Sequence, residues 1–431
     1  MSETKKPRIV VVGAGFAGFH CARWLDRRVG PKAELILVNP VDHMVYSALL
    51  ADVLGAVLDP GSLATPLAAS LPSTRVVVGS ITAVDTTSQS CTVLRIDGRH
   101  ERLAWDRLVL NPGSVTRTLG IRGVLEYAHG FKTLAETIYL REQILRQLQL
   151  ASTATEENTR TGHGSFVVVG GGFTGLELAG EGLRLSRAAL RQHPTLEPGT
   201  VRWTVVEAGS SVLRQFPDRL ARRALERMRR GGVDVRLGTG VAEIAADHVR
   251  LASGETLPTQ TVIWTAGVTP APIVSQLGLP VERGRLVVGD NLQAREHHYI
   301  YALGDAAAVP DLTHPGEVAA QTAQQAQRQG VTAARNVAAS LGHGKARAYK
   351  HHDLGFAVDL GGRNAVATPL GIPLSGLLAK LAGRAYHIKA LPSGRVRVLS
   401  GWIDTLISRR QIAELGLVNK RDATIQAEAT G

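Results

Sequence analysis

The stretch Ser165-Phe-Val-Val-Val-Gly-Gly-Gly-Phe-Thr-Gly-Leu-Glu-Leu-Ala-Gly-Glu181 joins an apolar strand to a glycine-rich turn and then to a helix. In such a turn Gly170 permits the sharp change of direction, Gly172 lets the backbone approach a pyrophosphate, and Gly175 lets the helix pack closely on the strand. The helix N-terminus offers its free N–H groups to the phosphates. The stretch therefore predicts a dinucleotide-binding loop.

A second copy of the pattern stands at the start of the chain, in Arg8-Ile-Val-Val-Val-Gly-Ala-Gly-Phe-Ala-Gly18, with Gly13, Gly15 and Gly18 at the three glycine positions. Two such units predict two dinucleotides, and the ordinary chemistry of the pair is electron transfer from a nicotinamide to a flavin. We therefore expect an α/β protein with two doubly wound, Rossmann-like dinucleotide-binding domains, followed by a C-terminal amphipathic segment.

Composition narrows the class further. A length of 431 residues predicts two or three domains, and the net charge of +12 favours either nucleic acid or an anionic membrane face as a partner. Cys21 and Cys91 are the only cysteines, which predicts a reducing compartment without disulfides and no metal site. The short polar stretch Met1 to Arg8 predicts a cytoplasmic protein. The longest uncharged run, Asn364 to Ala379, contains two prolines and is shorter than the roughly 20 apolar residues of a spanning helix.

Three strand ends carry candidate ligands for the sugars of the dinucleotides. Asn39 ends the second predicted strand, 21 residues after Gly18, where an acidic ribose ligand is usual, and an ordinary Asn-Pro turn is the alternative. Glu207 ends the strand after the central loop, where a carboxylate binds the ribose 2′-hydroxyl and repels a 2′-phosphate, which favours NADH over NADPH. A solvated glutamate at a strand end is the alternative. Asp305 ends a third buried strand before a predicted helix, and its carboxylate can accept from a hydroxyl of the flavin side chain.

Between these sites the sequence predicts a helix over 134–150, a polar linker over 151–164, and a lid over a ligand in 42–66, where apolar residues follow no clean period.

The two fingerprints, the turn at Trp264-Thr-Ala-Gly-Val, the Leu303-Gly-Asp305 segment and Ala320-Gln-Thr-Ala-Gln-Gln325 resemble the two-dinucleotide flavoproteins, and within them the type II NADH:quinone oxidoreductases. The resemblance covers roughly residues 8 to 410. The fingerprints are common to the superfamily, whereas GGGFTGLELAGE followed by AQTAQQ is more specific. The chain departs from the family at Asn39, at Phe173, where proline is common, and in a C-terminal segment poor in aromatic residues.

The resemblance implies a set of site residues and partners. It implies that Gly13, Gly15, Gly18 and Asp305 hold FAD, that Gly170, Gly172, Gly175 and Glu207 hold NADH, that Glu177 lies close to the flavin, and that Gln321 and Gln325 border a quinone.

The residues themselves leave alternatives open at the last two places. Glu177 is predicted in the first turn of its helix, where a glutamate ordinarily just favours the helix dipole. Beside an anionic pyrophosphate, however, it is expected to point toward the nicotinamide and flavin, where it steers the nicotinamide or relays a proton. Gln321 and Gln325 are four apart and are expected to share a helix face, with uncharged amides suited to quinone carbonyls. On the residues alone, a solvated polar stripe is a better explanation of the two glutamines than a quinone site. Only the resemblance makes the quinone site the preferred interpretation.

The segment from Arg363 to Arg410 predicts two basic amphipathic helices. Four leucines recur at helical spacing beside Lys380 and Arg384, and a second apolar stripe including Trp402 precedes Arg409 and Arg410. Such helices lie in an anionic membrane interface, and homodimer packing hides the same stripe equally well. We expect a peripheral protein on the cytoplasmic side of the cell membrane, and a homodimer.

These inferences predict an FAD-dependent, non-proton-pumping NADH:quinone oxidoreductase. The expected parts are an FAD domain in 1–125 and 286–345, an NADH domain in 126–285, and an attachment or dimerisation region in 346–431. An NAD(P)H-dependent ferredoxin or rubredoxin reductase is the alternative enzyme, and it needs no amphipathic C-terminus. A non-catalytic basic flavoprotein resembling apoptosis-inducing factor is the alternative of another class, although no nucleic-acid partner is expected.

Overall fold

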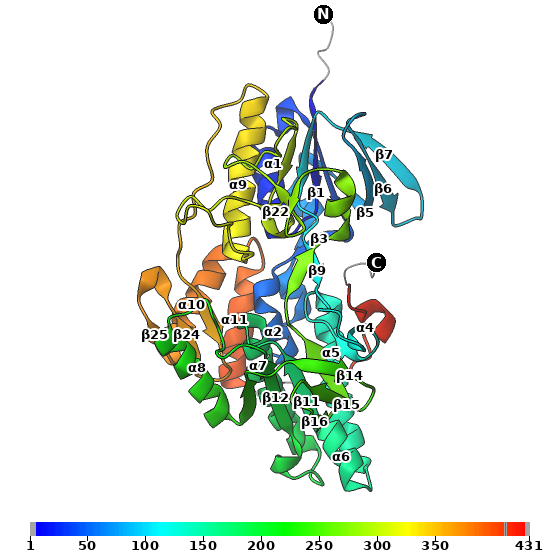
Figure 1. Ribbon diagram of the computed structural model, residues 1–431, viewed down its shortest axis with the longest axis vertical. Helices are drawn as coiled ribbons and strands as arrows, with labels where there is room; N and C mark the ends of the chain where they lie inside the picture. The colour runs from blue at the N-terminus through cyan, green and yellow to red at the C-terminus, as the bar shows by residue number, and fades with distance from the viewer. Residues whose placement is uncertain (1–5, 409, 411, 427–431) are drawn as a thin grey trace, which may run out of the picture.

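The computed structural model describes residues 6–408, 410 and 412–426. The first part of the molecule is built on a seven-stranded sheet in the order β21-β8-β1-β2-β5-β6-β7 (Figure 1). Strands β21, β8, β1, β2 and β5 run parallel, and β6 and β7 turn back as an antiparallel meander. The strands are β1 (Arg8–Val12), β2 (Glu34–Asn39), β5 (Thr74–Asp85), β6 (Ser90–Arg95), β7 (His100–Ala104), β8 (Arg107–Leu110) and β21 (Ile300–Ala302).

Strand β21 lies almost 200 residues after β8 in the chain, yet the two pair in register, Tyr301 beside Val109. The chain therefore leaves the first part and returns to it. Helices α1 (Phe16–Arg28) and α9 (Ala323–Ser340) pack against each other on one face of this sheet (Figure 1). They approach closely because a Cβ at Gly330 would lie 2.2 Å from the carbonyl oxygen of Ala17.

The second part is built on a parallel five-stranded sheet in the order β10-β17-β11-β12-β13. Every residue of β11 is buried, as the unbroken apolar run of the fingerprint requires. The strands are β10 (Ala128–His129), β11 (Ser165–Val169), β12 (Arg202–Glu207), β13 (Val233–Leu237) and β17 (Thr261–Trp264). The helices are α4 (Val124–Tyr127), α5 (Leu134–Thr153), α6 (Glu157–Gly164), α7 (Phe173–Ala189) and α8 (Asp218–Gly231).

Smaller elements complete the structure. The short strands are β3 (His43–Val45), β4 (Ala64–Pro66), β9 (Ser114–Thr116), β14 (Val241–Ile244), β15 (His248–Leu251), β16 (Thr256–Pro258), β18 (Val268–Pro270), β19 (Val281–Glu282), β20 (Arg285–Val287), β22 (Ala307–Ala308), β23 (Ala357–Asp359), β24 (Ala365–Ala367) and β25 (Leu374–Ser375). The remaining α-helices are α2 (Leu50–Leu54), α3 (Leu67–Ser70), α10 (Leu377–Ala390) and α11 (Arg395–Ile407). Antiparallel pairing of β9 with β18 links the two connections between the parts.

One expectation about a connecting segment is wrong. The linker predicted over 151–164 is largely helical, because α5 extends to Thr153 and α6 occupies Glu157–Gly164. A short helix such as α6 lacks a full hydrophobic period and is stabilised by its neighbours. The segment predicted as a lid over 42–66 contains α2, which packs on α5 and α7 with Leu50, Val53 and Leu54 buried, and its role as a lid stays a prediction.

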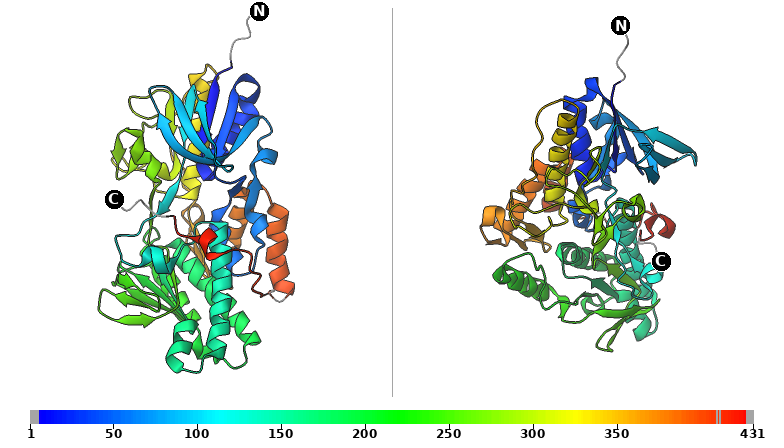
Figure 2. Two further views of the ribbon diagram at one scale, coloured as in Figure 1. Left: turned by 90° about the vertical axis from the view of Figure 1, so that its right-hand side faces the viewer. Right: turned by 45° about the horizontal axis from the view of Figure 1, so that its top comes forward.

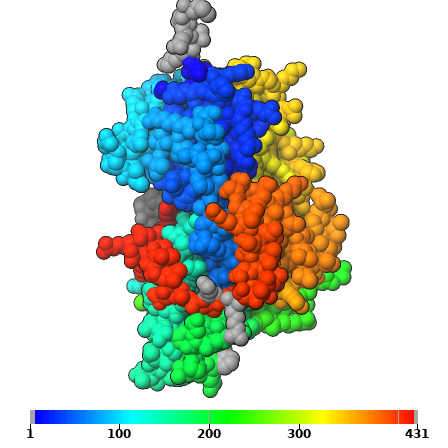
Figure 3. Space-filling view, turned by 180° about the vertical axis from the view of Figure 1, so that it is seen from behind, coloured from blue at the N-terminus to red at the C-terminus, as the bar shows by residue number. Residues whose placement is uncertain are grey.

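The C-terminal helices lie against the junction of the two parts. Figure 2 and Figure 3 show this orange-to-red segment beside the blue segment that contains α2. Both predicted helices are present, as α10 and α11. Arg409, which the sequence places after the second helix, and the first five residues of the N-terminal stretch lie outside the described residues.

Candidate active site

The first glycine loop joins β1 to α1 and has the geometry of a phosphate cradle. Gly13 has φ +86°, and a Cβ there would lie 2.0 Å from the carbonyl oxygen of Asn111. A Cβ at Gly18 would lie 1.9 Å from the carbonyl oxygen of Gly13, so the helix crosses the strand end at a distance that only glycine permits. Gly15 stands at the N-cap, and no side chain caps the helix. The first N–H groups of α1 are therefore available to an anionic ligand.

Asn39 ends β2, as predicted, and its amide braces the loop. Its Oδ1 accepts a hydrogen bond of 2.8 Å from the N–H of Ala14, and its Nδ2 donates to the carbonyl oxygen of Val41, also at 2.8 Å. An asparagine can do both because its amide donates and accepts, which a carboxylate cannot. The binding of a ribose by Asn39 stays a prediction, and the structure adds this bracing contact to it.

Asp305 belongs to a half-buried chain of polar contacts that the sequence did not indicate. Ser114 donates from Oγ to Asp305 Oδ2 at 2.6 Å, and Lys132 Nζ donates to Ser114 Oγ at 2.9 Å. Burial lowers the pKa of Lys132, while the Asp305 carboxylate acts in the opposite direction. The helix expected after Asp305 is wrong, because a single 3-10 turn, Gly304–Ala306, leads into β22.

The second glycine loop joins β11 to α7 and repeats the geometry of the first. Gly170 has φ +116°, and a Cβ at Gly175 would lie 1.9 Å from the carbonyl oxygen of Gly170. A Cβ at Gly172, in contrast, would meet no atom within 4 Å. The loop is thus closely packed toward the fold and open on its outer side, and α7 also begins without a side-chain cap.

Glu207 lies beside this loop at the end of β12. Its Oε2 accepts from the N–H of Gly171, and its Oε1 accepts from the N–H of Gly209 and from Arg214 Nη2, each at 2.8 Å. Burial opposes ionisation, but these donors and the Arg214 charge together hold the pKa of Glu207 below its ordinary value. The side chain is therefore an anion at neutral pH, fixed next to the open loop.

Glu177 is the fifth residue of α7, so it lies in the second turn and not in the first, as the sequence argument assumed. It lines a cavity with about 470 Å³ of empty space, part of it open to solvent. The cavity is bounded by α2, α7, β23, β24, α10 and α11. Burial raises the pKa of Glu177 well above its ordinary value, and a hydrogen bond of 3.1 Å from the N–H of Asp359 to its Oε1 opposes that rise. A carboxyl whose pKa is raised by burial is suited to proton transfer.

The cavity holds further charged groups that sequence analysis missed or placed wrongly. Lys380 was expected on the basic outer side of its helix, yet it is buried and its Nζ lies 2.6 Å from Asp359 Oδ2. Trp402 was expected in the exposed apolar stripe, yet it is buried and donates from Nε1 to Asp52 Oδ2 at 2.9 Å. The one sequence signal for such a site is an acidic residue inside an apolar run, as Asp52 is in Leu49-Leu-Ala-Asp-Val-Leu54.

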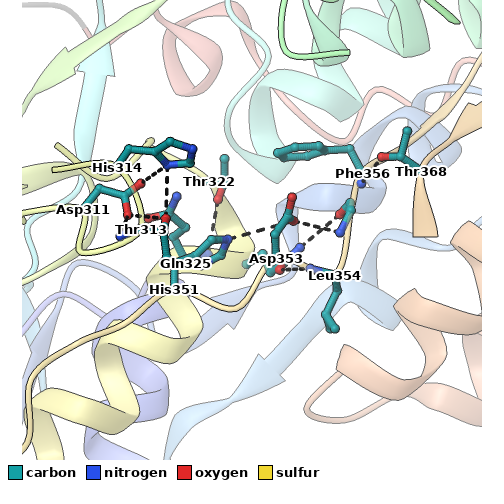
Figure 4. Close-up of polar contacts among 12 residues, drawn as sticks. Asp311, Thr313, His314, Thr322, Gln325, His351, Asp353, Leu354, Phe356 and Thr368 are labelled. Carbon is teal, nitrogen blue, oxygen red and sulfur yellow. Dashed lines mark hydrogen bonds and ion pairs between the residues drawn. The ribbon is translucent and has the colours of Figure 1, made fainter. Parts of the chain in front are cut away.

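Gln321 and Gln325 lie at the start of α9 but do not share a helix face. The helix begins at Ala323 with Thr322 as its N-cap, so Gln321 precedes it, exposed, with Nε2 3.3 Å from the carbonyl oxygen of Asp305. Gln325 is buried, and its Oε1 has no hydrogen-bond partner among the described residues. Figure 4 shows Gln325 and Thr322 facing the segment that carries Asp353, Leu354 and Phe356.

Phe173, the departure from the family's proline, has a packing role. Its ring lies 5.6 Å from that of Phe216 and 5.5 Å from that of Phe356, measured between centroids. These three rings attach the glycine loop to the segment after α9. Aromatic contacts of this kind favour tilted arrangements.

The fold and these loops define an oxidoreductase class with two dinucleotide sites. The chain matches the model of the pyridine nucleotide-disulphide oxidoreductase family over residues 7–330. It is 30% identical to demethylphylloquinone reductase NdbB of Synechocystis sp., over 92% of this chain and 95% of the relative. It is 25% identical to the type II NADH:quinone oxidoreductase Ndh of Mycobacterium tuberculosis, over 94% of this chain and 89% of the relative.

A solved structure of NDH2 from Plasmodium falciparum, in complex with NADH, has the same fold. Its TM-score is 0.87 at 17% identity, over 95% of this chain and all of that one. The chain belongs to the pyridine nucleotide-disulphide oxidoreductase family and, within it, to the type II NADH:quinone oxidoreductases. Disulphide chemistry is not its mechanism, because Cys21 and Cys91 are free, buried and on different elements, α1 and β6.

Proposed function

We propose that the chain is an FAD-dependent NADH:quinone oxidoreductase that pumps no protons and reduces a membrane quinone. The arrangement of α10 favours a quinone as the acceptor. This helix turns Lys380 into the cavity beside Glu177, and it turns Leu377, Leu378 and Leu381 outward, where each is more than half exposed. A redox cavity beneath an apolar surface suits a lipid-soluble acceptor, whereas a soluble electron-transfer protein needs no such surface.

The loops fit the two dinucleotides. The cradle of Gly13, Gly15 and Gly18 with its uncapped helix, together with the half-buried Asp305 carboxylate, fits the pyrophosphate and sugar-alcohol of FAD. The open loop at Gly172 with the anionic Glu207 fits NADH. FAD held by these residues would supply the chemistry of hydride acceptance from NADH and of two-electron reduction of the quinone.

The chain's own residues have distinct tasks in this scheme. Glu207 orients the ribose of NADH and disfavours a 2′-phosphate, because its charge is fixed by three donors. Glu177 holds a proton beside the reacting groups. Gln325 suits both forms of the acceptor, since its amide N–H₂ donates to a quinone carbonyl and its unpartnered Oε1 accepts from a quinol hydroxyl.

Attachment to the membrane belongs to the same proposal. Of the described helices, none is long and apolar enough to cross a membrane. On α11, Val396, Leu406 and Ile407 are about four-fifths exposed, and they add to the exposed apolar side chains of α10. We place this surface in the interface on the cytoplasmic side of the cell membrane, with residues 346–431 as the attachment region, 1–125 with 286–345 as the FAD domain, and 126–285 as the NADH domain. A homodimer that buries the same surface is the competing use.

Turnover of NADH with a soluble quinone, compared with a ferredoxin and with no added acceptor, tests the function. Quinone-dependent turnover well above both controls supports the proposal. Turnover with ferredoxin in preference to quinone makes the chain a ferredoxin reductase, and no turnover with any acceptor favours the non-catalytic alternative.

A further inference from the structure

Among the described residues, four carboxyl groups line the cavity, and two of them contact a cation while the other two do not. Glu181 is paired with Arg410, whose Nη2 lies 3.0 Å from Oε2, and Asp359 is paired with Lys380 at 2.6 Å. Asp52 and Glu177 accept instead from uncharged groups, the indole Nε1 of Trp402 and the backbone N–H of Asp359. The cations of the cavity thus neutralise one pair of carboxylates and leave the other pair to exist as neutral acids.

The overall reaction needs a proton from water. NADH gives up a hydride, which is equivalent to two electrons and one proton. The quinone takes up two electrons and two protons to become a quinol. The balance is NADH + H⁺ + quinone giving NAD⁺ + quinol. A buried acid beside the acceptor can deliver that proton once, and a second group must then replace it from solvent.

We propose that Asp52 is the relay residue that reprotonates Glu177 from solvent through the shared cavity during quinone reduction. The inference rests on the proposed function. In the step, the O–H bond of the Asp52 carboxyl breaks and an O–H bond forms on the Glu177 carboxylate, directly or through water in the cavity, and Asp52 regains a proton from bulk water. No electron moves in this step.

The position of Asp52 suits a relay between the two parts of the molecule. Asp52 lies on α2, and its side chain is 7% exposed. Helix α2 packs on α7, the helix that carries Glu177 and Glu181. Trp402 of α11 fixes the carboxyl by its hydrogen bond, so the group cannot turn away from the cavity wall. The same cavity is partly open to solvent, which supplies the proton.

The charges around Asp52 agree with this role. Burial, followed by the charges of Asp359 and Glu181, raises the pKa of Asp52 to about 7, and the Trp402 hydrogen bond and Lys380 oppose the rise. A group with a pKa near the working pH both gives and takes a proton readily. Glu177, Arg384 and His387 also line the cavity, and Arg410, Arg184 and Tyr46 contact its lining at Glu181 and His387. Helix α5 also packs on α2, but its Glu142 accepts from the N–H of Leu415 and lies outside the cavity lining.

Two variants of the holoenzyme and one control test the proposal. Asp52→Asn keeps an acceptor for Trp402 but removes the proton. Trp402→Phe keeps the carboxyl and removes the donor that favours its ionised form, so the pKa of Asp52 should rise further. Asp26→Asn is the matched control, because Asp26 is also a buried aspartate, accepts hydrogen bonds from Ser73 and Thr74, and does not line the cavity.

The measurements are stopped-flow reoxidation of NADH-reduced enzyme by a soluble quinone from pH 5 to 9, and an infrared titration of protonated carboxyl bands without quinone. Wild type and Asp26→Asn should slow above about pH 7, and Trp402→Phe should slow at a higher pH than wild type. Asp52→Asn should reoxidise roughly tenfold or more slowly at pH 6, within the range of a lost acid–base group. It should also lose one infrared band that titrates in wild type.

The outcomes separate this inference from the function it rests on. Equal rates and pH profiles for Asp52→Asn and wild type, with quinone reduction intact in both, overturn the relay and leave the function standing. Failure of wild-type enzyme to reduce quinone overturns the function and the relay with it. Loss of NADH-dependent flavin bleaching in Asp52→Asn identifies a structural defect, and Trp402→Phe then decides, because an unmoved pH profile in that variant overturns the relay.

Discussion

We expect Glu207 to determine nicotinamide choice, because three donors hold its carboxylate in place beside the second glycine loop. Glu207→Gln removes the charge that repels a 2′-phosphate and frees Arg214 to pair with it. We expect the ratio of kcat/KM for NADH over NADPH to fall roughly tenfold, the change that about 1.4 kcal/mol produces. Steady-state kinetics with both nucleotides measure it. Glu243→Gln is the control, since Glu243 is a surface carboxylate of the same part, paired with Arg250. An unchanged ratio in Glu207→Gln would remove Glu207 from the ribose site.

Asp52 also links stability to pH. Its pKa in the folded state is about 7, above the ordinary value near 3.8, so the unfolded chain binds fewer protons between these two values. The contribution of Asp52 to stability is therefore complete below about pH 4 and is lost as the pH rises through about 7. Asp52→Asn should have a higher Tm relative to wild type at pH 8 than at pH 5, by calorimetry. If the difference in Tm is the same at both pH values, Asp52 is not a buried neutral acid.

Single residues differ in how far the sequence reveals their position. The place of Glu207 was predictable, because a strand and a glycine loop within 45 residues determine it. The environment of Asp52 was not, since its hydrogen-bond partner Trp402 lies 350 positions along the chain. Lys132 escaped notice for the same reason, because Ser114 and Asp305 come to it from other elements.

In the loop before α7 and the first turn of that helix, Gly175 is needed for packing of the fold, and we expect Gly172 to be needed for binding of NADH. A Cβ at Gly175 would overlap the carbonyl oxygen of Gly170, whereas a Cβ at Gly172 would enter open space beside the helix N-terminus. Gly175→Ala should lower the free energy of unfolding by roughly 2 kcal/mol or more, as overpacking of a rigid contact does. Gly172→Ala should keep wild-type stability and raise KM for NADH about tenfold, because the methyl group occupies the approach of the pyrophosphate. Chemical denaturation and NADH kinetics on both variants check this. Equal loss of stability in the two would contradict the proposed orientation of the loop.

Elements with strong periodicity or a fingerprint were predicted close to their observed bounds, as β11, α5 and β12 illustrate. The start of α9 was not, because Thr322 caps the helix after Gln321, and this cap depends on one hydrogen bond that the N–H of Gln325 donates to Thr322 Oγ1. The leucines of α10 are exposed, as the predicted interface stripe requires, but the burial of Lys380 in the cavity was not foreseen, because periodicity alone does not reveal a buried charge.

For the whole molecule, the exposed leucines of α10 should govern membrane attachment. Leu378→Gln with Leu381→Gln should weaken binding to anionic liposomes more than tenfold, because each buried leucine contributes about 1.5–3 kcal/mol. These substitutions are preferable to deletion of the C-terminal region, since Trp402 and Lys380 form part of the cavity. Ile96→Gln, an 82% exposed isoleucine next to β6, is the control. Unchanged liposome binding together with a shift from dimer to monomer in sedimentation would favour the homodimer.

We expect NADH and the quinone to use different walls of one redox site. Gln325 tests this separation most directly. Gln325→Leu removes the buried amide and leaves both glycine loops untouched. In anaerobic stopped flow, NADH should bleach the flavin of this variant at the wild-type rate, while reoxidation by quinone should be about tenfold slower or more, as the loss of a hydrogen bond of about 1–3 kcal/mol requires. Slow bleaching by NADH with normal reoxidation by quinone would place Gln325 on the nicotinamide side and contradict the account.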